Sequence, residues 1–128
     1  MLYAILCYDS EEAVGSWTKE QDDVAMTKLA AVQDGWERQG RLGPVARLMG
    51  TTSARTLRKG RSTLITDGPF AETKEQLLGF FVVECDTPEQ ALEAAQELGR
   101  ASSSNGAFEI RPISFFRPGG QTPVERDG

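Results

Sequence analysis

The 128-residue sequence contains no histidine, and this absence excludes several classes of chemistry at once. Ser-His-Asp and Cys-His catalysis, histidine-ligated metal sites and histidine pH switches all require an imidazole ring. Two cysteines are too few to build a zinc site by themselves. We therefore predict no metal and no cofactor, and the composition limits the chemistry without naming a reaction.

Long apolar runs are also missing. No run approaches the roughly 20 residues that a membrane-spanning helix needs, and residues 1–7 lack the length and the basic flank of a signal peptide. We expect a cytoplasmic protein with no membrane span. Fourteen basic and nineteen acidic residues give a net charge of −5, which argues against nonspecific binding to nucleic acid or anionic membranes. A local basic patch is compatible with this balance.

The rest of the composition is that of an ordinary globular protein, with 39% hydrophobic and 26% charged residues. The length predicts one domain over residues 1–117. Residues 118–128 are rich in glycine and proline and are expected to form a loose tail.

Apolar periodicity predicts four strands and two helices, with a hairpin between them. The capping-box pair Thr18 and Gln21 begins the first helix and Gly40 ends it, while Thr87 and Pro88 begin the second. The expected elements are strands over 2–8, 42–50, 79–85 and 108–116, helices over 18–39 and 88–98, a hairpin over 54–66 and a polar connection over 9–15.

This β-α-β-β-α-β order predicts an α+β, ferredoxin-like fold, in which an antiparallel four-stranded sheet carries both helices on one face. Strands 2–8 and 79–85 are apolar on both faces, so the face without helices also needs a cover. We expect a homodimer in which the open sheet faces of two copies pack together. We also expect these two strands to run parallel, with Cys7 and Cys85 reduced and buried as small apolar residues.

Residues 66–81 have the sequence TDGPFAETKEQLLGFF, which resembles the signature of the YCII-related family in its DGPF-domain branch. The opening MLYAIL and the closing FEIRPI, residues 108–113, are similar to that branch too. The resemblance implies a dimeric α/β barrel and a family of largely unknown biochemical role. Members of the branch are often encoded beside extracytoplasmic-function sigma factors, which implies a regulatory or stress-linked setting. Some relatives carry a His-Asp pair proposed to be catalytic, and here only Asp67 matches it.

Asp67 is the first candidate for catalysis, because it ends a strand at a Gly-Pro turn and suits a general acid or base at a cleft mouth. The alternative is an Asx-turn residue that accepts backbone hydrogen bonds. Glu72 and Lys74 complete the candidate catalytic set, since a lysine among carboxylates orients an anionic or carbonyl substrate. The alternative is a solvated polar segment. With Glu75 these carboxylates also permit an oxygen-ligated metal, although no metal-binding loop pattern is present.

Arg111, Tyr8 and Phe70 are the candidates for binding a substrate. Arg111 lies on the polar face of the last predicted strand, where it could clamp a carboxylate or phosphate. The alternative is an ion pair with Glu109 that sets the strand or the dimer. Aromatic residues such as Tyr8 suit the wall of a small apolar pocket, but they also suit the core.

Three classes of function remain open. The first is a cofactor-free enzyme acting on a small molecule, because folds of this kind often place chemistry in the cleft between sheet and helices. The second is a module that binds or senses a small molecule in the same cleft without turnover. The third is a protein-interaction module that uses the basic hairpin tip, Arg58 to Arg61, on an acidic partner. The alternative for that tip is a solvated loop.

Overall fold

A computed structural model describes residues 1–102 and 104–120 of the chain. From residue 121 onward, the predicted tail lies outside the described residues. The elements are β1 (Leu2–Ser10), α1 (Glu11–Gly15), α2 (Lys19–Arg38), β2 (Leu42–Arg47), the 3-10 turn η1 (Thr51–Ser53), β3 (Arg55–Arg58), β4 (Leu64–Asp67), β5 (Glu75–Glu84), α3 (Pro88–Ala101) and β6 (Ala107–Pro112).

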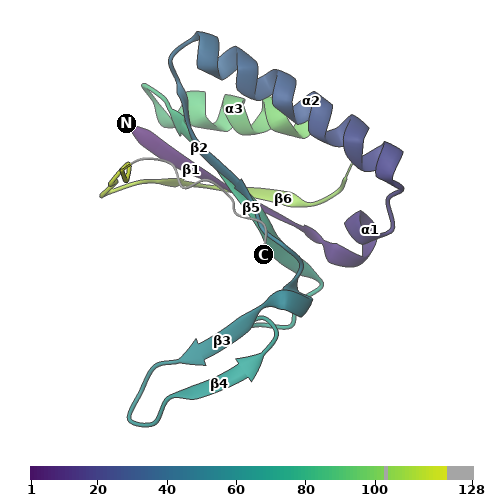
Figure 1. Ribbon diagram of the computed structural model, residues 1–128. Coiled ribbons are helices and arrows are strands. Elements are labelled where there is room, and N and C mark those ends of the chain that lie inside the picture. The colour runs from purple at the N-terminus through teal and green to yellow at the C-terminus, as the bar shows by residue number, and fades with distance from the viewer. Residues whose placement is uncertain (103, 121–128) are drawn as a thin grey trace.

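The main sheet has four strands in the order β2-β5-β1-β6, and every neighbouring pair is antiparallel. Helices α2 and α3 lie on one face of this sheet, while β3 and β4 form a separate two-stranded sheet beyond its end (Figure 1). The chain therefore has the predicted α+β, ferredoxin-like fold. Within the described residues, no helix combines the length and the apolar character that crossing a membrane requires.

The direction of the central strands differs from the prediction. β1 and β5 run antiparallel, with Leu2 opposite Glu84 and Cys7 opposite Gly79. Cys85 follows Glu84 and is six residues beyond Gly79, so the two cysteines lie at opposite ends of the sheet, roughly 20 Å apart along the strand at about 3.3 Å per residue. Both cysteines are free, as predicted. They are not neighbours, however, as they would be if the two strands ran parallel.

The helix boundaries follow the predicted caps. The hydroxyl of Thr18 accepts a hydrogen bond from the backbone N–H of Gln21 at 3.1 Å, and the side chain of Gln21 accepts one from the N–H of Thr18 at 2.9 Å. Gly40 follows α2 with a φ of 70°, which favours glycine. Gly99 does not end α3, because an internal glycine costs only about 1 kcal/mol and the next two residues continue the helix to Ala101.

Several other boundaries differ from the sequence prediction, among them the end of β1, at Ser10 rather than 8, and the end of β2, at Arg47 rather than 50. The connection over 9–15 contains the five-residue helix α1, which is capped by Ser10 and is too short to show an apolar period. β5 begins at Glu75 rather than Gly79, because backbone pairing with β1 continues through charged residues. β6 ends at Pro112, short of the predicted 116.

The core lies between the helices and one face of the sheet. Ile5 of β1 and Val83 of β5 are fully buried, and Trp36 of α2 is 1% exposed. The rings of Trp36 and Phe81 meet edge to face at 6.1 Å, and the Trp36 indole N–H donates to Glu97 of α3 at 3.3 Å. Phe81 and Val83 thus face the helices, and alternation places their neighbours Phe80 and Val82 on the opposite, open face.

We predict that Val83→Asp prevents folding, because it buries an unpaired carboxylate beneath the helices at a cost of several kcal/mol. Urea unfolding followed by circular dichroism measures this loss. Leu92→Asp is the matched control, since Leu92 is 51% exposed on α3. A folded Val83→Asp protein as stable as this control would contradict the assignment of the sheet faces.

Candidate functional site

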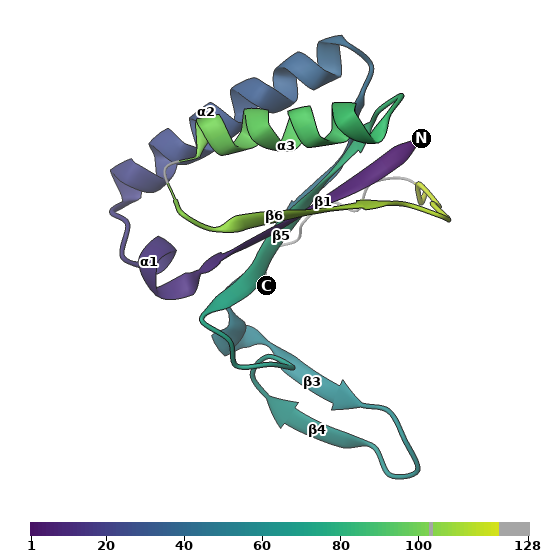
Figure 2. The same cartoon turned by 180° about the vertical axis from the view of Figure 1, so that it is seen from behind.

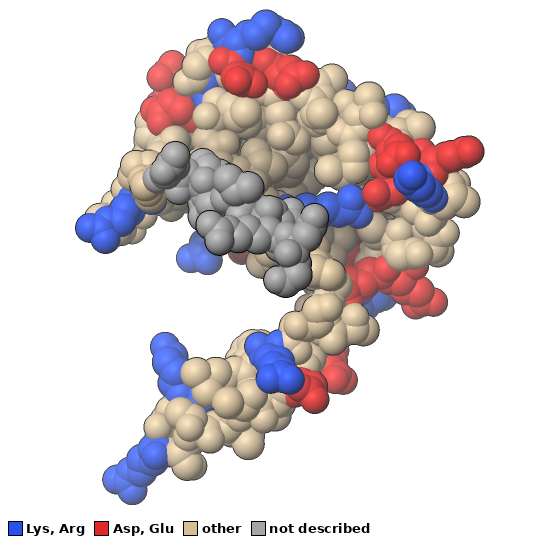
Figure 3. Space-filling view, viewed as in Figure 1, with Lys and Arg blue, Asp and Glu red and all other residues tan. Residues whose placement is uncertain are grey.

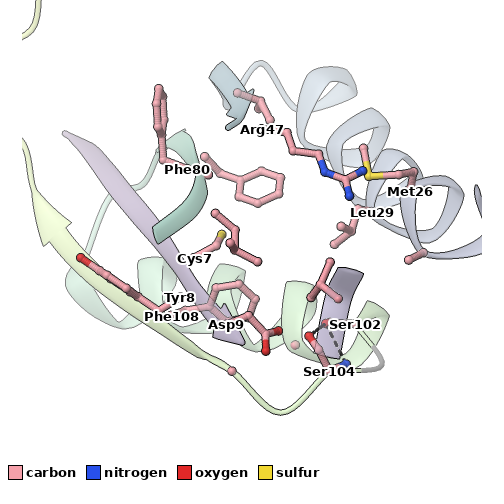
Figure 4. A pocket seen from close by; sticks show the side chains of 18 of the residues that line it. Cys7, Tyr8, Asp9, Met26, Leu29, Arg47, Phe80, Ser102, Ser104 and Phe108 are labelled. Atoms are coloured by element: carbon pink, nitrogen blue, oxygen red, sulfur yellow. Dashed lines mark hydrogen bonds between the residues drawn. The ribbon is translucent and has the colours of Figure 1, made fainter. Parts of the chain in front are cut away.

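A cavity lies between α2 and the sheet and has a volume of about 310 Å³. This volume is within the usual range for small-molecule pockets, roughly 300–1,000 Å³. Several short residues border it, namely Ala25, Ala46, Gly79, Gly99 and Gly106. Its walls are mainly apolar, and the larger apolar residues that line it include Val14, Met26, Leu29, Leu78, Phe81 and Phe108. We call this cavity the cleft (Figure 4).

An ion pair closes one edge of the cleft. The Arg47 guanidinium at the end of β2 donates to both carboxylate oxygens of Asp22 on α2, at 2.8 and 3.2 Å. These hydrogen bonds hold the pKa of Asp22 below its ordinary value of 3.8 and raise the pKa of Arg47. Both groups therefore stay ionised at neutral pH, and the pair joins the first half of α2 to the sheet.

Other polar groups border the cleft near α1 and the end of α3. Asp9 of β1 lines the cleft, and its carboxylate accepts a hydrogen bond from the Ser10 N–H at 2.7 Å. The hydroxyls of Ser102 and Ser104 lie 2.9 Å apart and hydrogen-bond to each other (Figure 4). The cleft thus combines an apolar wall with a few polar groups at its edges.

Cys7 also lines the cleft, but its thiol is a poor nucleophile there. Burial raises the pKa of Cys7 to about 12, because a thiolate would lose its hydration. The thiolate is the reactive form, so almost none is present at neutral pH. Cys7 therefore acts as an apolar wall residue.

The three predicted catalytic residues lie outside the cleft. Asp67 ends β4 in the separate two-stranded sheet, where its side chain is 92% exposed and lies 3.6 Å from Arg55. Glu72 and Lys74 are exposed in the loop between β4 and β5. Within residues 1–102 and 104–120, no three acidic, cysteine or histidine side chains lie close enough together to hold a metal ion.

The DGPF turn has a clear structural role instead. Gly68 has a φ of 98°, its N–H donates to the Ala54 carbonyl at 2.8 Å, and its carbonyl accepts from the Thr56 hydroxyl at 2.9 Å. These bonds close the base of the β3–β4 hairpin. An Asx turn at Asp67 would need the N–H of residue 69, which is a proline and has none, so the Asx turn that we considered for Asp67 does not form. Gln76 fixes the following loop by donating to the carbonyls of Ala71 and Thr73.

The three predicted substrate-binding residues are not brought together either. Tyr8 borders the cleft, but its side chain points away from it, as does that of Phe80 (Figure 4). Phe70 is 72% exposed beneath the guanidinium of Arg58, 5.1 Å from its ring centre. Arg111 pairs in register with Ala4 and is exposed on the open face. No salt bridge joins it to Glu109 among the described residues.

Sequence reasoning missed Asp22, Arg47 and Asp9 as residues of the site. Each comes from a different element and none belongs to a recognisable spacing. Periodicity alone indicated the apolar wall, because Ala25, Leu29 and the buried strand residues form the stripes that face each other.

Comparisons with known proteins agree with the resemblance. The model of the family described as YCII-related domain matches residues 1–117. The chain is also 49% identical over 120 residues to "Uncharacterized protein R00369" of Rhizobium meliloti (strain 1021), covering 93% of this chain and 97% of that relative. The chain belongs to the YCII-related family. Its place in the DGPF branch stays a prediction.

The ion pair at the cleft edge makes stability depend on pH. The pKa of Asp22 is lower in the folded state than its ordinary value of 3.8. The contribution of Asp22 to the free energy of unfolding is therefore fully present above about pH 3.8, and it is lost as the pH falls through the pKa of the folded state. We predict that Asp22→Asn lowers the melting temperature at neutral pH and that this difference disappears in strong acid. High salt should reduce it as well.

Thermal unfolding across a pH series, with Asp23→Asn as control, measures this effect. Asp23 is the next residue on the same helix, is not among the residues that line the cleft and makes no salt bridge among the described residues. An Asp22→Asn difference that persists unchanged in acid would contradict the assignment.

Proposed function

We propose that this YCII-related protein binds a small, largely apolar molecule in the cleft between α2 and the sheet. The observation that carries the proposal is the cavity of about 310 Å³, with its apolar wall and few polar groups. Leu29, Phe81 and Phe108 suit the apolar body of a ligand. Ser102 and the Arg47–Asp22 pair suit hydrogen-bonding groups at two separate edges of the cleft (Figure 4).

Binding without turnover is supported by the state of the thiol and the arginine at the cleft. Its thiol stays protonated, and its arginine is already engaged by a carboxylate. The carboxylate at the DGPF turn, which the cofactor-free enzyme hypothesis requires, lies outside the cleft of the same chain. The DGPF resemblance, with its sigma-factor setting, also favours a sensor over a catalyst.

A bulky side chain that occupies part of the cleft should weaken ligand binding there. Met26 lies at the cleft and is 40% exposed, so Met26→Trp adds bulk there without disturbing the core. A thermal-shift screen against small metabolites identifies a ligand of the parent, which at about 100 times its Kd stabilises the fold by roughly 2.7 kcal/mol. We predict that Met26→Trp weakens that ligand by at least about tenfold, or 1.4 kcal/mol.

Val24→Trp is the matched control, because Val24 lies on the same helix, is 54% exposed and is not part of the cleft wall. It should bind like the parent. Equal affinity of both variants for the ligand would place the site elsewhere.

Replacing the predicted catalytic aspartate, Asp67, distinguishes ligand binding in the cleft from catalysis at the DGPF turn. Since Asp67 is 92% exposed, Asp67→Ala should change the free energy of unfolding by less than about 0.5 kcal/mol. We predict that it also leaves ligand affinity in the cleft unchanged, as isothermal calorimetry would measure. A turnover of the ligand by the parent that Asp67→Ala abolishes would favour the enzyme over the binding module.

A further inference from the structure

The two polar edges of the cleft differ in charge. At one edge, both carboxylate oxygens of Asp22 accept hydrogen bonds from the Arg47 guanidinium, so the two charges cancel. At the other edge lies Asp9, which pairs with no cation among the described residues. The charged residues that line the cleft are therefore two carboxylates and one guanidinium, with a net charge of −1. This imbalance limits the kind of ligand that the cleft accepts.

The carboxylate of Asp9 has one oxygen that remains available to a ligand. Its Oδ1 atom accepts the Ser10 N–H at 2.7 Å, whereas no hydrogen bond to Oδ2 forms within the described part of the chain. Asp9 is half-buried, so salt screens its charge less than that of a fully exposed carboxylate. A charge that is partly removed from water is stabilised by a partner of opposite sign.

The chain between α3 and β6 completes this edge of the cleft. A Cβ atom at position 106 would lie 2.9 Å from Oδ2 of Asp9 and would collide with the Tyr8 carbonyl, so Gly106 allows the backbone to come close. Ser102 and Ser104 precede this glycine, and their hydroxyls hydrogen-bond to each other at 2.9 Å. The same carboxylate is thus bordered by a glycine backbone and by residues that carry hydroxyl groups.

The pictures place these groups together. The end of β1, the end of α3 and the start of β6 lie at one end of the sheet in both views (Figures 1 and 2). The close-up shows the Asp9 carboxylate on the side of the cleft where Ser102 and Ser104 lie (Figure 4). We call Asp9, Ser102 and Ser104 the acidic edge of the cleft.

The part of the molecule that holds the cleft is acidic as well. Residues 54–70, which contain β3 and β4, include four basic residues and one acidic residue and thus carry a net charge of +3. The whole chain carries −5, so the remainder carries −8. In the space-filling view, acidic side chains are spread over this remainder (Figure 3). A field of this sign attracts cations and repels anions.

We infer that the ligand of the cleft is a primary amine whose ammonium group binds at the acidic edge. This inference rests on the proposed function of the cleft and names the class of molecule that it binds. An ammonium group carries three donors and no acceptor, which matches a carboxylate oxygen and two hydroxyl oxygens. Charge-assisted hydrogen bonds are roughly twice as strong as neutral ones. The apolar body of the amine then lies against Leu29, Phe81 and Phe108.

A carboxylate ligand suits the same cleft least. It would bring a second negative charge beside Asp9, and the Arg47 guanidinium is already bound by Asp22. A neutral alcohol finds hydrogen bonds at the acidic edge without the attraction between opposite charges. For one and the same apolar body, the order of affinity is therefore amine, then alcohol, then carboxylate.

Matched probes test this order. Phenethylamine, phenethyl alcohol and hydrocinnamate share a phenylethyl body, and hexylamine, hexanol and heptanoate share a hexyl body. Alkylammonium groups stay charged at neutral pH, as a lysine side chain does. Titrations of the isotope-labelled protein at constant ionic strength, followed by amide chemical shifts, measure each dissociation constant. We expect each amine to bind at least about tenfold tighter than its matched alcohol and to perturb the amides of Asp9 and Gly106.

Removing the charge of Asp9 tests the acidic edge directly. Asp9→Asn keeps the shape of the side chain and an oxygen that accepts the Ser10 N–H. We expect the affinity for the amine to fall by at least about tenfold, whereas the affinity for the alcohol stays the same. Asp23→Asn is the matched control, because it removes the same charge from an exposed residue that does not line the cleft. It should bind the amine like the parent.

Two results would overturn the inference: an alcohol or carboxylate that binds as tightly as its matched amine, or an amine whose affinity Asp9→Asn leaves unchanged. The parent alone gives the first result, so the test does not depend on the folding of a variant. The cleft proposal is separable, because Met26→Trp reduces the space in the cleft and should weaken any probe bound there, whatever its head group. Failure of every probe to bind would contradict both the inference and the proposed function.

Discussion

The packing of Trp36 against Phe81 is the contact on which the rest of the structure depends. It fixes the second half of α2 to the central strand β5, and the indole N–H ties that end of the helix to α3. The first half of α2 has only the small Ala25 buried, and the Arg47–Asp22 pair holds it to the sheet at a distance. The cleft is the space between these two attachments, so the core and the site have a common origin.

Alternation along the central strands gives the two faces of the sheet different roles. Phe81 faces the helices and the cleft, while its neighbour Phe80 points to the open side. A small molecule on one face and a second copy of the chain on the other would therefore use separate residues.

The sequence predicted the elements well because their signals are local. The capping box at Thr18, the glycine at position 40 and the apolar stripes depend only on nearby residues. Strand direction between β1 and β5 was wrong, because side-chain alternation is the same for parallel and antiparallel neighbours. The site was missed for a related reason: Asp22 and Arg47 are 25 positions apart and meet only in the fold. We predicted a catalytic role for Asp67 because the DGPF sequence is unusual. In the structure, the glycine of this turn, Gly68, closes the base of the β3–β4 hairpin.

The measurement that tests the account most directly is a titration of the isotope-labelled protein with a ligand from the thermal-shift screen, followed by backbone amide chemical shifts. The account predicts that the perturbed amides gather on α2 around residues 25–33, on β1 near Cys7 and on β5 near Phe81. Perturbed amides at residues 67–74, with the amides of α2 unchanged, would contradict the cleft as the functional site. That result would favour the hypothesis of catalysis at the DGPF turn.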